Sequence, residues 1–410
     1  MDWIRRSSLS TRYRSPWGLK KSAEVIAFGV VIVATFLIFM SMDGQTSRNR
    51  LDLDQSSGCH FPAVYNFGDS NSDTGAVSAT FGRLSLPNGQ TFFRKPAGRY
   101  CDGRLVIDFI AEKLGQPYLS AYLDSIGTNF RHGANFAASG STIQPADSAI
   151  LKGHVNPLSL NVQLLQFEQF KDRTAELYTE AKNSYIRSGL PRPADFSKAL
   201  YTMDTGQNDL HAGITSMREE EVQKHVPNII NEFSIAIKNL HQLGARTFWI
   251  HNTGPIGCLP FFVVNYPPKA GNSDQNGCVK SYNDLAQKFN KQLKDKIIQL
   301  RTELNNVFIT YVDIYSVKYA LISEARKHGF SSPLGYCCGH YGDYRARCGR
   351  KSLVNGTELY GTSCKKPEEY LSWDGIHYSE AANKLVADHI LDGSFSDPPV
   401  ALSEACHKPV

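Results

Sequence analysis

The chain has 410 residues, of which 41% are hydrophobic and 20% are charged, and its glycines and prolines are spread along it. This composition is that of a globular protein, which excludes a disordered or collagen-like chain. The formal net charge is +5, but residues 1–24 carry six basic and two acidic side chains, so the other residues have a net charge of +1. Such a balance gives no support for nucleic-acid binding, which needs a basic surface on the folded domain.

The N-terminal region has the pattern of a membrane-targeting segment. A basic tail at residues 1–24 precedes an uncharged apolar run at residues 25–42. The run reaches the lower limit of the ~17–25 residues that a spanning helix needs, and no good signal-peptide cleavage site follows it. We therefore expect a transmembrane signal anchor, with a cleaved signal peptide as the alternative. Because basic residues mark the cytosolic side, the chain beyond residue 42 would be lumenal or extracellular, as in a single-pass type II membrane protein.

The rest of the chain is expected to form one domain. No linker-like stretch or internal repeat divides it after residue 58. We therefore expect a stem at residues 43–58, a domain at 59–395 and a C-terminal tail at 396–410.

Nine cysteines fit a lumenal placement, because oxidising compartments favour disulfides. The odd number leaves at least one thiol free or intermolecular, and the sequence does not fix the pairing. The alternative is a zinc site in the cluster of Cys337, Cys338, His340, Cys348 and Cys364. We expect no metal there, since adjacent cysteines suit a closed tetrahedral site poorly. In the same stretch, Asn355 begins the glycosylation acceptor pattern Asn-Gly-Thr.

Short apolar runs alternate with a helical pattern in this domain. The runs lie at residues 61–67, 199–203, 246–250 and 307–312, and such runs suit strands that are buried on both faces. Between the last two, large apolar side chains recur at helical spacing from Leu285 to Leu304. The alternation predicts an α/β fold with a central parallel sheet and helices on both sides.

Polar residues at the strand ends mark the expected ligand site, because open α/β sheets bind ligands at the carboxyl ends of their strands. Gly68-Asp69-Ser70 follows the first run and presents a serine there. Gly133, at a second junction, and Asn208, after Gly206, could each supply a hydrogen-bond donor to an oxyanion. Taken singly, each also has a structural interpretation: a turn for Ser70 and Gly133, and a helix cap for Asn208.

Near the C-terminus, Asp374 precedes His377 by three residues, just before a helical stretch that starts at Ser379. A carboxylate at this spacing can orient an imidazole while the other ring nitrogen takes a serine proton, as in a catalytic triad. The pattern Asp-x-x-His arises by chance in a chain of this length. Its meaning therefore comes from the serine and the oxyanion donors found earlier in the chain.

Taken in order, these motifs resemble the four blocks of the SGNH hydrolases, and in particular the plant GDSL esterase/lipase family. The resemblance covers nearly all of residues 59–395 and includes longer stretches at 67–75, 98–104 and 373–377. It implies a three-layer α/β/α fold of flavodoxin type and the hydrolysis of carboxylic esters without a metal or other cofactor.

The resemblance also implies a role for each residue of the site. Ser70 would be the nucleophile, His377 the general base and Asp374 its orienting carboxylate. The oxyanion would be held by the N–H groups of Ser70 and Gly133 and by the side-chain amide of Asn208. The sequence departs from the family's name at the residue after the serine, an asparagine where leucine is usual. Because every catalytic group is intact, this departure concerns the substrate and not the chemistry.

The substrate expectation combines this departure with the predicted anchor. A plant subgroup that shares the asparagine resembles acetylesterases on sugar-containing substrates, and one member has been described as a fucosidase. Glycoside hydrolysis ordinarily needs two carboxylates, and the expected site offers one. We therefore expect removal of O-acetyl groups from a cell-wall polysaccharide such as xylan, in the Golgi. The alternatives are a lipase or other acyl-ester hydrolase, an acyltransferase, a fucosidase-like glycosidase, and a non-catalytic carbohydrate-binding relative.

Overall fold

The computed structural model describes residues 58–151, 156–181, 183–340 and 346–406. The expected basic tail, the apolar run and nearly all of the stem lie outside these residues. Within the described ranges, we find no helix with the length and apolar character needed to cross a membrane. Residues from 59 onward form one compact unit.

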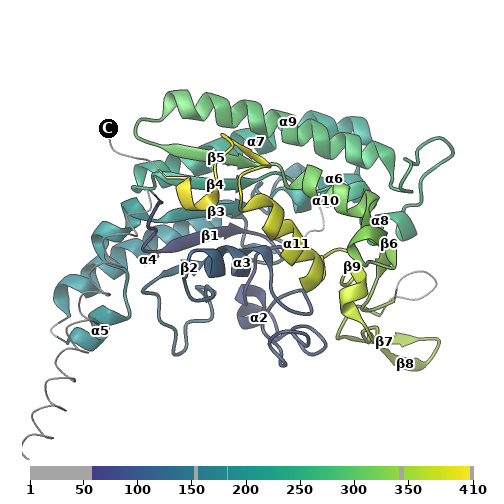
Figure 1. The fold of residues 1–410 in the computed structure, drawn as a ribbon, viewed down its shortest axis with the longest axis horizontal. Helices are drawn as coiled ribbons and strands as arrows, with labels where there is room; N and C mark the ends of the chain where they lie inside the picture. The colour runs from purple at the N-terminus through teal and green to yellow at the C-terminus, as the bar shows by residue number, and fades with distance from the viewer. Residues whose placement is uncertain (1–57, 152–155, 182, 341–345, 407–410) are drawn as a thin grey trace, which may run out of the picture. The chain divides into compact units, whose positions relative to one another are not determined.

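A six-stranded sheet lies at the centre of this unit, with the strand order β10-β5-β4-β3-β1-β2 (Figure 1). The strands are β1 (Val64–Gly68), β2 (Gly133–Asn135), β3 (Leu200–Asp204), β4 (Thr247–His251), β5 (Phe308–Val312) and β10 (Ser396–Asp397). The first five are parallel, and β10 adds an antiparallel edge strand. Without β10, the order 2-1-3-4-5 is that of the flavodoxin-like fold. The predicted fold class is confirmed, and the four predicted runs are β1, β3, β4 and β5.

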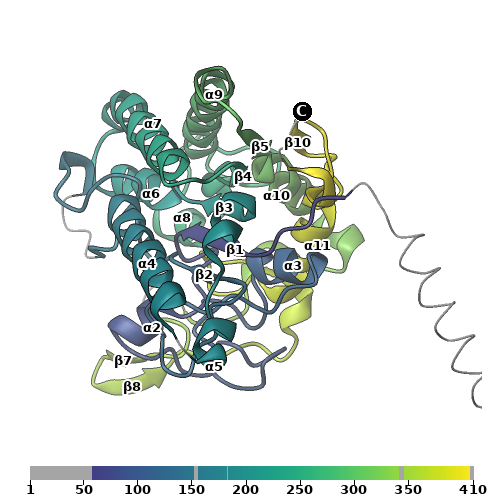
Figure 2. The same cartoon turned by 90° about the vertical axis from the view of Figure 1, so that its left-hand side faces the viewer.

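Helices cover both faces of the sheet and make three layers (Figure 2). One layer contains α4 (Leu160–Glu180), α7 (Glu219–Gln242) and α9 (Lys280–Glu303), and the other contains α3 (Val106–Lys113), α10 (Ile314–Ser323) and α11 (Glu380–Ile390). The predicted helix is α9. Because side chains alternate along a strand, Tyr65 and Phe67 of β1 join the core under α4, while Val64 joins the core under α3. Because side chains of β1 are buried on both faces of the sheet, the position of its carboxyl end is fixed.

Shorter elements lie outside these three layers. The remaining α-helices are α2 (Ala76–Thr80), α5 (Ser184–Ser188), α6 (Gln207–Ser216) and α8 (Pro260–Asn265). Two small sheets pair β6 (Ser332–Tyr336) with β9 (Tyr370–Ser372) and β7 (Lys351–Val354) with β8 (Thr357–Tyr360). The turn between β7 and β8 is Asn355-Gly356, with φ of 48° and 78°. Positive φ at both residues is what a tight hairpin turn needs, so Asn355 has a structural role as well as an exposed side chain.

The fold extends beyond residue 395, the expected end of the domain. Strand β10 pairs with Tyr311 and Val312 of β5, and a disulfide joins Cys406 to Cys59. Residues 396–406 therefore belong to the domain and are not a separate tail, because they complete the sheet edge and close the chain covalently.

Eight of the nine cysteines form disulfides. The pairs are Cys59–Cys406, Cys258–Cys278, Cys337–Cys364 and Cys338–Cys348. Cys101 is free and buried, which accounts for the odd number. The four cysteines of the C-terminal cluster have no thiolate to offer, so they cannot form the alternative zinc site. Cys258 and Cys278 also lie close to Asp274, but these two cysteines form a disulfide and so offer no thiolate to a metal ion.

Candidate active site

Ser70 lies in the turn that follows β1, at the carboxyl edge of the sheet. The N–H groups of Ser72 and Asp73 donate to the carbonyl oxygen of Asp69 (3.1 and 2.9 Å), which makes one helical turn around the serine. Ser70 is 8% exposed. Within the described part of the chain, neither its hydroxyl nor its N–H makes a hydrogen bond. Both groups are therefore available to a substrate.

Asp374 and His377 form a close pair in the loop between β9 and α11. Oδ2 of Asp374 lies 2.7 Å from Nδ1 of His377, and Oδ1 accepts the backbone N–H groups of Ile376 (3.0 Å) and His377 (2.8 Å). Burial raises the pKa of the Asp374 carboxyl, but the charge of His377 and these hydrogen bonds outweigh it, so the pKa lies below its usual value. The ionised carboxylate fixes the imidazole with Nε2 as the ring nitrogen that can take a proton.

Gly133 is not part of this site, so the expectation that it binds an oxyanion is wrong. It begins β2 and pairs with Val64, the first residue of β1, at the amino edge of the sheet. Ser70 follows the other end of β1, roughly 20 Å away at about 3.3 Å per residue. The N–H of Gly133 donates to the carbonyl of Phe130 (3.0 Å). Glycine is needed because an added Cβ would lie 1.9 Å from the Val64 carbonyl oxygen.

Gly140, and not Gly133, lies at the carboxyl edge of the sheet, where a backbone donor to the oxyanion was expected. It lies in the loop after β2, where the N–H of Ala138 (3.1 Å) and the hydroxyl of Ser141 (2.6 Å) both donate to the carbonyl of Gly68. These bonds hold the loop against the Ser70 turn. Among the residues that the structure describes, no acceptor takes the N–H of Gly140. Gly140 is therefore the candidate for the backbone donor that the sequence analysis misassigned.

Asn208 lies beside this loop, as expected for an oxyanion donor. It is the second residue of α6, directly after β3. Its Nδ2 donates to the carbonyl of Ser141 (2.9 Å). Because a side-chain amide has two N–H bonds, this hydrogen bond orients the group and leaves the second N–H for a ligand. Ser70, Gly140 and Asn208 thus come from three neighbouring strand ends at the β1/β3 position where the strand order reverses.

Two buried carboxylates fix the loop that carries Gly140. Asp73 accepts the N–H of Ser139 (2.8 Å) together with N–H groups at the start of α2. Asp209 accepts the N–H groups of Ile143 and Gln144 (both 2.9 Å). Burial raises the pKa of Asp209 to about 7, although the two hydrogen bonds favour its ionised form. The loop is therefore tied to the serine turn at one end and to α6 at the other.

Asn71, the residue that departs from the family pattern, stabilises the turn that carries Ser70. Its backbone N–H (3.0 Å) and its Nδ2 (3.2 Å) both donate to Oδ1 of Asp69. Asp69 is 1% exposed, and burial together with the charge of Asp204 raises its pKa, while the hydrogen bond from Asn71 lowers it. A leucine would remove one of these two donors. Asp69 therefore has a structural role in this turn.

The residues next to the candidate catalytic groups meet around one small cavity. Its volume is about 10 Å³, which is room for about one water molecule. The polar lining includes Asn71, Gln207 and the amine of Lys318, and the apolar lining includes Ile256 and Leu259. Ile376 and Tyr378, on either side of His377, also line it. The turn of Ser70, the start of α6 and the loop of His377 therefore converge.

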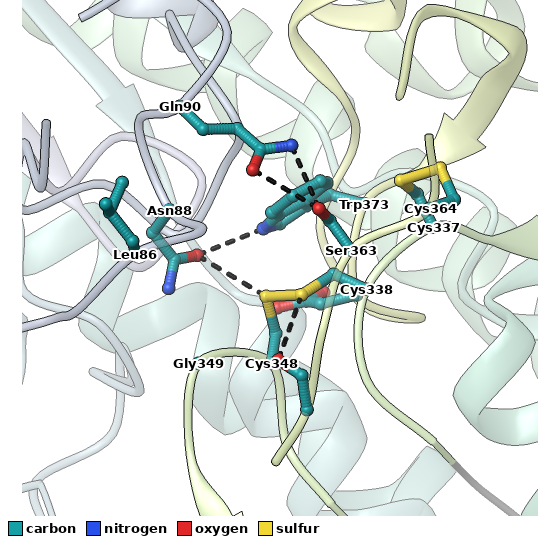
Figure 3. Close-up of a disulfide and its surroundings, with 12 residues drawn as sticks. Leu86, Asn88, Gln90, Cys337, Cys338, Cys348, Gly349, Ser363, Cys364 and Trp373 are labelled. Atoms are coloured by element: carbon teal, nitrogen blue, oxygen red, sulfur yellow. Dashed lines mark hydrogen bonds between the residues drawn. A yellow bond between two sulfur atoms is a disulfide. The ribbon is translucent and has the colours of Figure 1, made fainter. Parts of the chain in front are cut away.

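A disulfide-linked segment supports the loop that carries Asp374 (Figure 3). The carbonyl of Trp373 accepts the N–H groups of Cys337 (2.9 Å) and Cys338 (2.6 Å), and each of these cysteines is in a disulfide. Figure 3 shows the Trp373 indole directed at Asn88, to which its N–H donates (3.0 Å). Trp373 is fully buried. The backbone just before Asp374 is thus held from two sides.

Comparisons with known proteins agree with this geometry. The GDSL-like lipase/acylhydrolase family model matches residues 64–390. A GDSL esterase/lipase of Arabidopsis thaliana, At5g14450, is 52% identical over 85% of this chain and 90% of its own length. A protein of the same plant named alpha-L-fucosidase 3 is 50% identical over 85% and 93%. An esterase of Hevea brasiliensis is 49% identical over 86% and 91%.

Among solved structures, a lipase from a goat rumen metagenome, Lip_vut3, aligns at 13% identity over 81% of this chain and 97% of its own. Its TM-score of 0.34 is too low to carry an argument about the fold. The family match and the plant relatives do not depend on it. Together they show that the chain is a carboxylic ester hydrolase of the plant GDSL esterase/lipase family, within the SGNH hydrolase superfamily.

Proposed function

We propose that this enzyme removes O-acetyl groups from a plant cell-wall polysaccharide such as xylan. Ser70 attacks the ester carbonyl while Nε2 of His377 takes its proton, and the alcohol leaves with a proton returned by the imidazole. Water activated by the same imidazole then releases acetate from the acyl-enzyme. The oxyanion accepts hydrogen bonds from the N–H groups of Ser70 and Gly140 and from the Asn208 amide.

The confined surroundings of the catalytic groups are the observation that carries the acetyl part of the proposal. The space lined by Asn71, Gln207 and the loop of His377 has a volume of about 10 Å³, which is room for about one water molecule. Ile256 and Leu259 offer apolar side chains there, and Lys318 adds a polar one. We expect a short acyl group to displace these residues less than a fatty-acid chain does.

The name of the fucosidase relative raises glycoside hydrolysis as a second candidate, but the site favours ester cleavage. Glycosidases ordinarily place two carboxylates on opposite sides of the scissile bond. Asp374 is bonded to His377, and Asp69 and Asp73 are buried and accept backbone N–H groups. None of the three is placed as a free acid or base above the serine.

The purified enzyme is expected to release acetate from acetylated xylan and to hydrolyse an octanoyl ester far more slowly, by roughly tenfold or more for each methylene that the cavity rejects. Acetate release and p-nitrophenyl ester kinetics measure this preference. Leu259→Ala enlarges the cavity and should shift the preference toward butyryl esters, whereas Ile298→Ala, on the exposed face of α9, should not. Equal or faster cleavage of the octanoyl ester would contradict the acetyl proposal and favour a lipase.

The acceptor step separates hydrolysis from acyl transfer. With acetylated xylan as donor and a xylo-oligosaccharide as added acceptor, a hydrolase yields free acetate, and a transferase yields the acetylated acceptor. The product of this reaction therefore decides between water and the sugar as the acceptor. We place the function with water as acceptor because relatives such as At5g14450 and the Hevea brasiliensis protein are named as esterases.

The location of the enzyme is a further part of the proposal. Residues 25–42 anchor the chain in the Golgi membrane with the catalytic domain in the lumen, where nascent wall polysaccharides pass. The four disulfides support an oxidising compartment. Exposed Asn355 is the proposed glycosylation acceptor in this lumenal domain.

In plant cells, the full-length protein is expected to sediment with membranes and to resist extraction at high salt and alkaline pH, because an apolar run of this length spans the bilayer. Mass spectrometry of its N-terminal peptide should find residues 1–24 still attached. A soluble form that begins near residue 43 would instead establish a cleaved signal peptide and secretion.

A further inference from the structure

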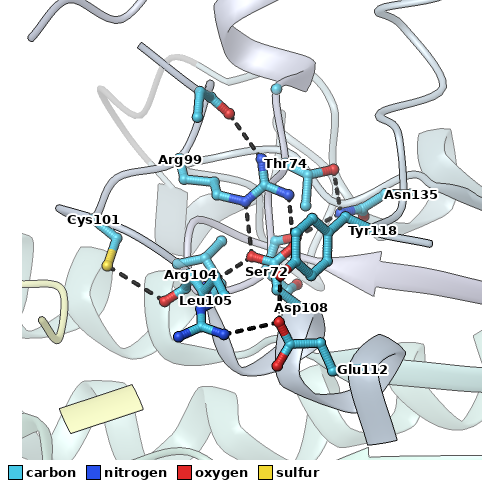
Figure 4. Close-up of polar contacts among 12 residues, drawn as sticks. Ser72, Thr74, Arg99, Cys101, Arg104, Leu105, Asp108, Glu112, Tyr118 and Asn135 are labelled. Atoms are coloured by element: carbon cyan, nitrogen blue, oxygen red, sulfur yellow. Dashed lines mark hydrogen bonds and ion pairs between the residues drawn. The ribbon is translucent and has the colours of Figure 1, made fainter. Parts of the chain in front are cut away.

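The stretch at residues 98–104 matches the family closely, yet the proposed chemistry uses none of its residues. It lies between α2 and α3 and is held rigidly at Arg99 (Figure 4). The buried guanidinium of Arg99 donates to both carboxylate oxygens of Asp108 in α3 (2.6 and 2.8 Å) and to the carbonyl of Ala97 (2.9 Å). A bidentate arginine–carboxylate pair of this kind fixes geometry as well as charge.

The same stretch is also tied to α11, the helix that follows the His377 loop. Oδ1 of Asp102 accepts the N–H of Glu380 (2.8 Å), the first residue of α11. Arg104 pairs with Glu380 and with Glu112 (2.6 and 2.8 Å). Residues 99–104 thus form a rigid support that is attached on both sides and stands next to the catalytic loop.

Tyr100 is the one side chain of this support that reaches the candidate site. Its ring lies against the imidazole of His377, with 5.2 Å between the ring centroids and an angle of 34° between their planes. Its hydroxyl lies near the side chain of Ser139, the neighbour of Gly140. Burial raises the pKa of the Tyr100 phenol, so the hydroxyl stays protonated at the pH of the lumen.

We propose that Tyr100 is a positioning residue that sets the distance between the general base and the oxyanion loop. Its ring restricts rotation of the His377 imidazole, and its hydroxyl lies next to Ser139 in the loop that presents the Gly140 N–H. The inference rests on the proposed catalytic roles of His377 and Gly140. An aromatic face also attracts the imidazolium that forms when His377 takes the serine proton. The charged groups around this contact are Asp374 at Nδ1 of His377, and Asp73 and Arg350 near the Tyr100 hydroxyl.

Two substitutions separate the ring from the hydroxyl. Tyr100→Leu removes both, and we expect kcat on p-nitrophenyl acetate to fall about tenfold to hundredfold with KM within about twofold, since small displacements of catalytic groups have effects of this size. Tyr100→Phe keeps the ring, so its kcat should fall only a few-fold.

Tyr118→Leu is the matched control. Tyr118 is also partly buried and bonded to a neighbour, Glu112 (Figure 4). This variant should lose thermal stability to a similar extent while keeping kcat. If Tyr100→Leu behaves like Tyr118→Leu, Tyr100 only fills space and the inference is wrong. If the unmodified enzyme itself fails to hydrolyse the ester, the proposed function is wrong instead, so the two failures are distinguishable.

Discussion

Replacing Ser70 with alanine is expected to abolish ester hydrolysis while the fold remains intact. Loss of the nucleophile of a serine hydrolase lowers kcat by about 10⁶-fold, because no other group can form the acyl-enzyme. The cost in stability should be within about 0.5 kcal/mol, as for substitutions that remove no contact. The Ser70 hydroxyl makes no hydrogen bond with any residue that the structure describes. Hydrolysis of p-nitrophenyl acetate and thermal unfolding measure the two effects.

Ser72 provides a matched control two residues along the same turn. Its hydroxyl is buried and has no hydrogen-bond partner in the described residues, and its carbonyl contacts do not depend on the side chain. Ser72→Ala should therefore keep kcat within about twofold, since the reaction does not use this hydroxyl. Full activity in Ser70→Ala, or an equal loss in both variants, would remove Ser70 from the nucleophile role.

Asp374→Asn is expected to lower kcat by about 10⁴-fold with little change in KM. The reason lies in how the two carboxylate oxygens are used. Oδ1 accepts two backbone N–H groups, so the oxygen of an asparagine would remain there, and its NH₂ group would face Nδ1 of His377. His377 would then accept at Nδ1 and carry its proton on Nε2. In this tautomer the imidazole cannot take the proton of Ser70.

The control for this exchange is Asp313→Asn. Asp313 also accepts a backbone N–H, that of Ser316 at the start of α10, and asparagine caps a helix as well as aspartate does. Its activity should match that of the unmodified enzyme. Steady-state kinetics with both variants checks the prediction. Asp374→Asn with full activity would mean that another group orients His377.

The sequence predicted the layers of the fold well, because burial on both faces leaves a clear signal. The apolar runs at 199–203, 246–250 and 307–312 are β3, β4 and β5, displaced by one residue at most. The two-residue strand β10 left no such signal. It joins the sheet through contacts with β5 that residues 396–397 do not encode by themselves. A short edge strand forms because of the strand with which it pairs, and a single sequence does not show which segments pair.

The candidate site differs from the expectation in one backbone donor. Ser70, Asn208, Asp374 and His377 lie in segments that converge at the carboxyl edge of the sheet, and their catalytic roles stay predictions. Gly133 lies at the other edge, and the sequence did not distinguish it from Gly140 because a backbone donor has no side-chain signature. The apolar residues after Gly133 show that the strand begins there, so the glycine at the carboxyl end is Gly140, seven residues on. The direction of β2 distinguishes the two glycines, because Gly133 lies at its amino end and Gly140 lies beyond its carboxyl end.

The disulfide between Cys59 and Cys406 makes the covalent path of the domain a closed ring. Its two cysteines are 347 residues apart in sequence, and a cross-link over so long a loop restricts the unfolded chain strongly. A single backbone cut in the exposed Asn355-Gly356 turn would therefore leave both fragments joined. The catalytic domain thus keeps both of its ends after such a cut, and the same ring offers a natural point for circular permutation.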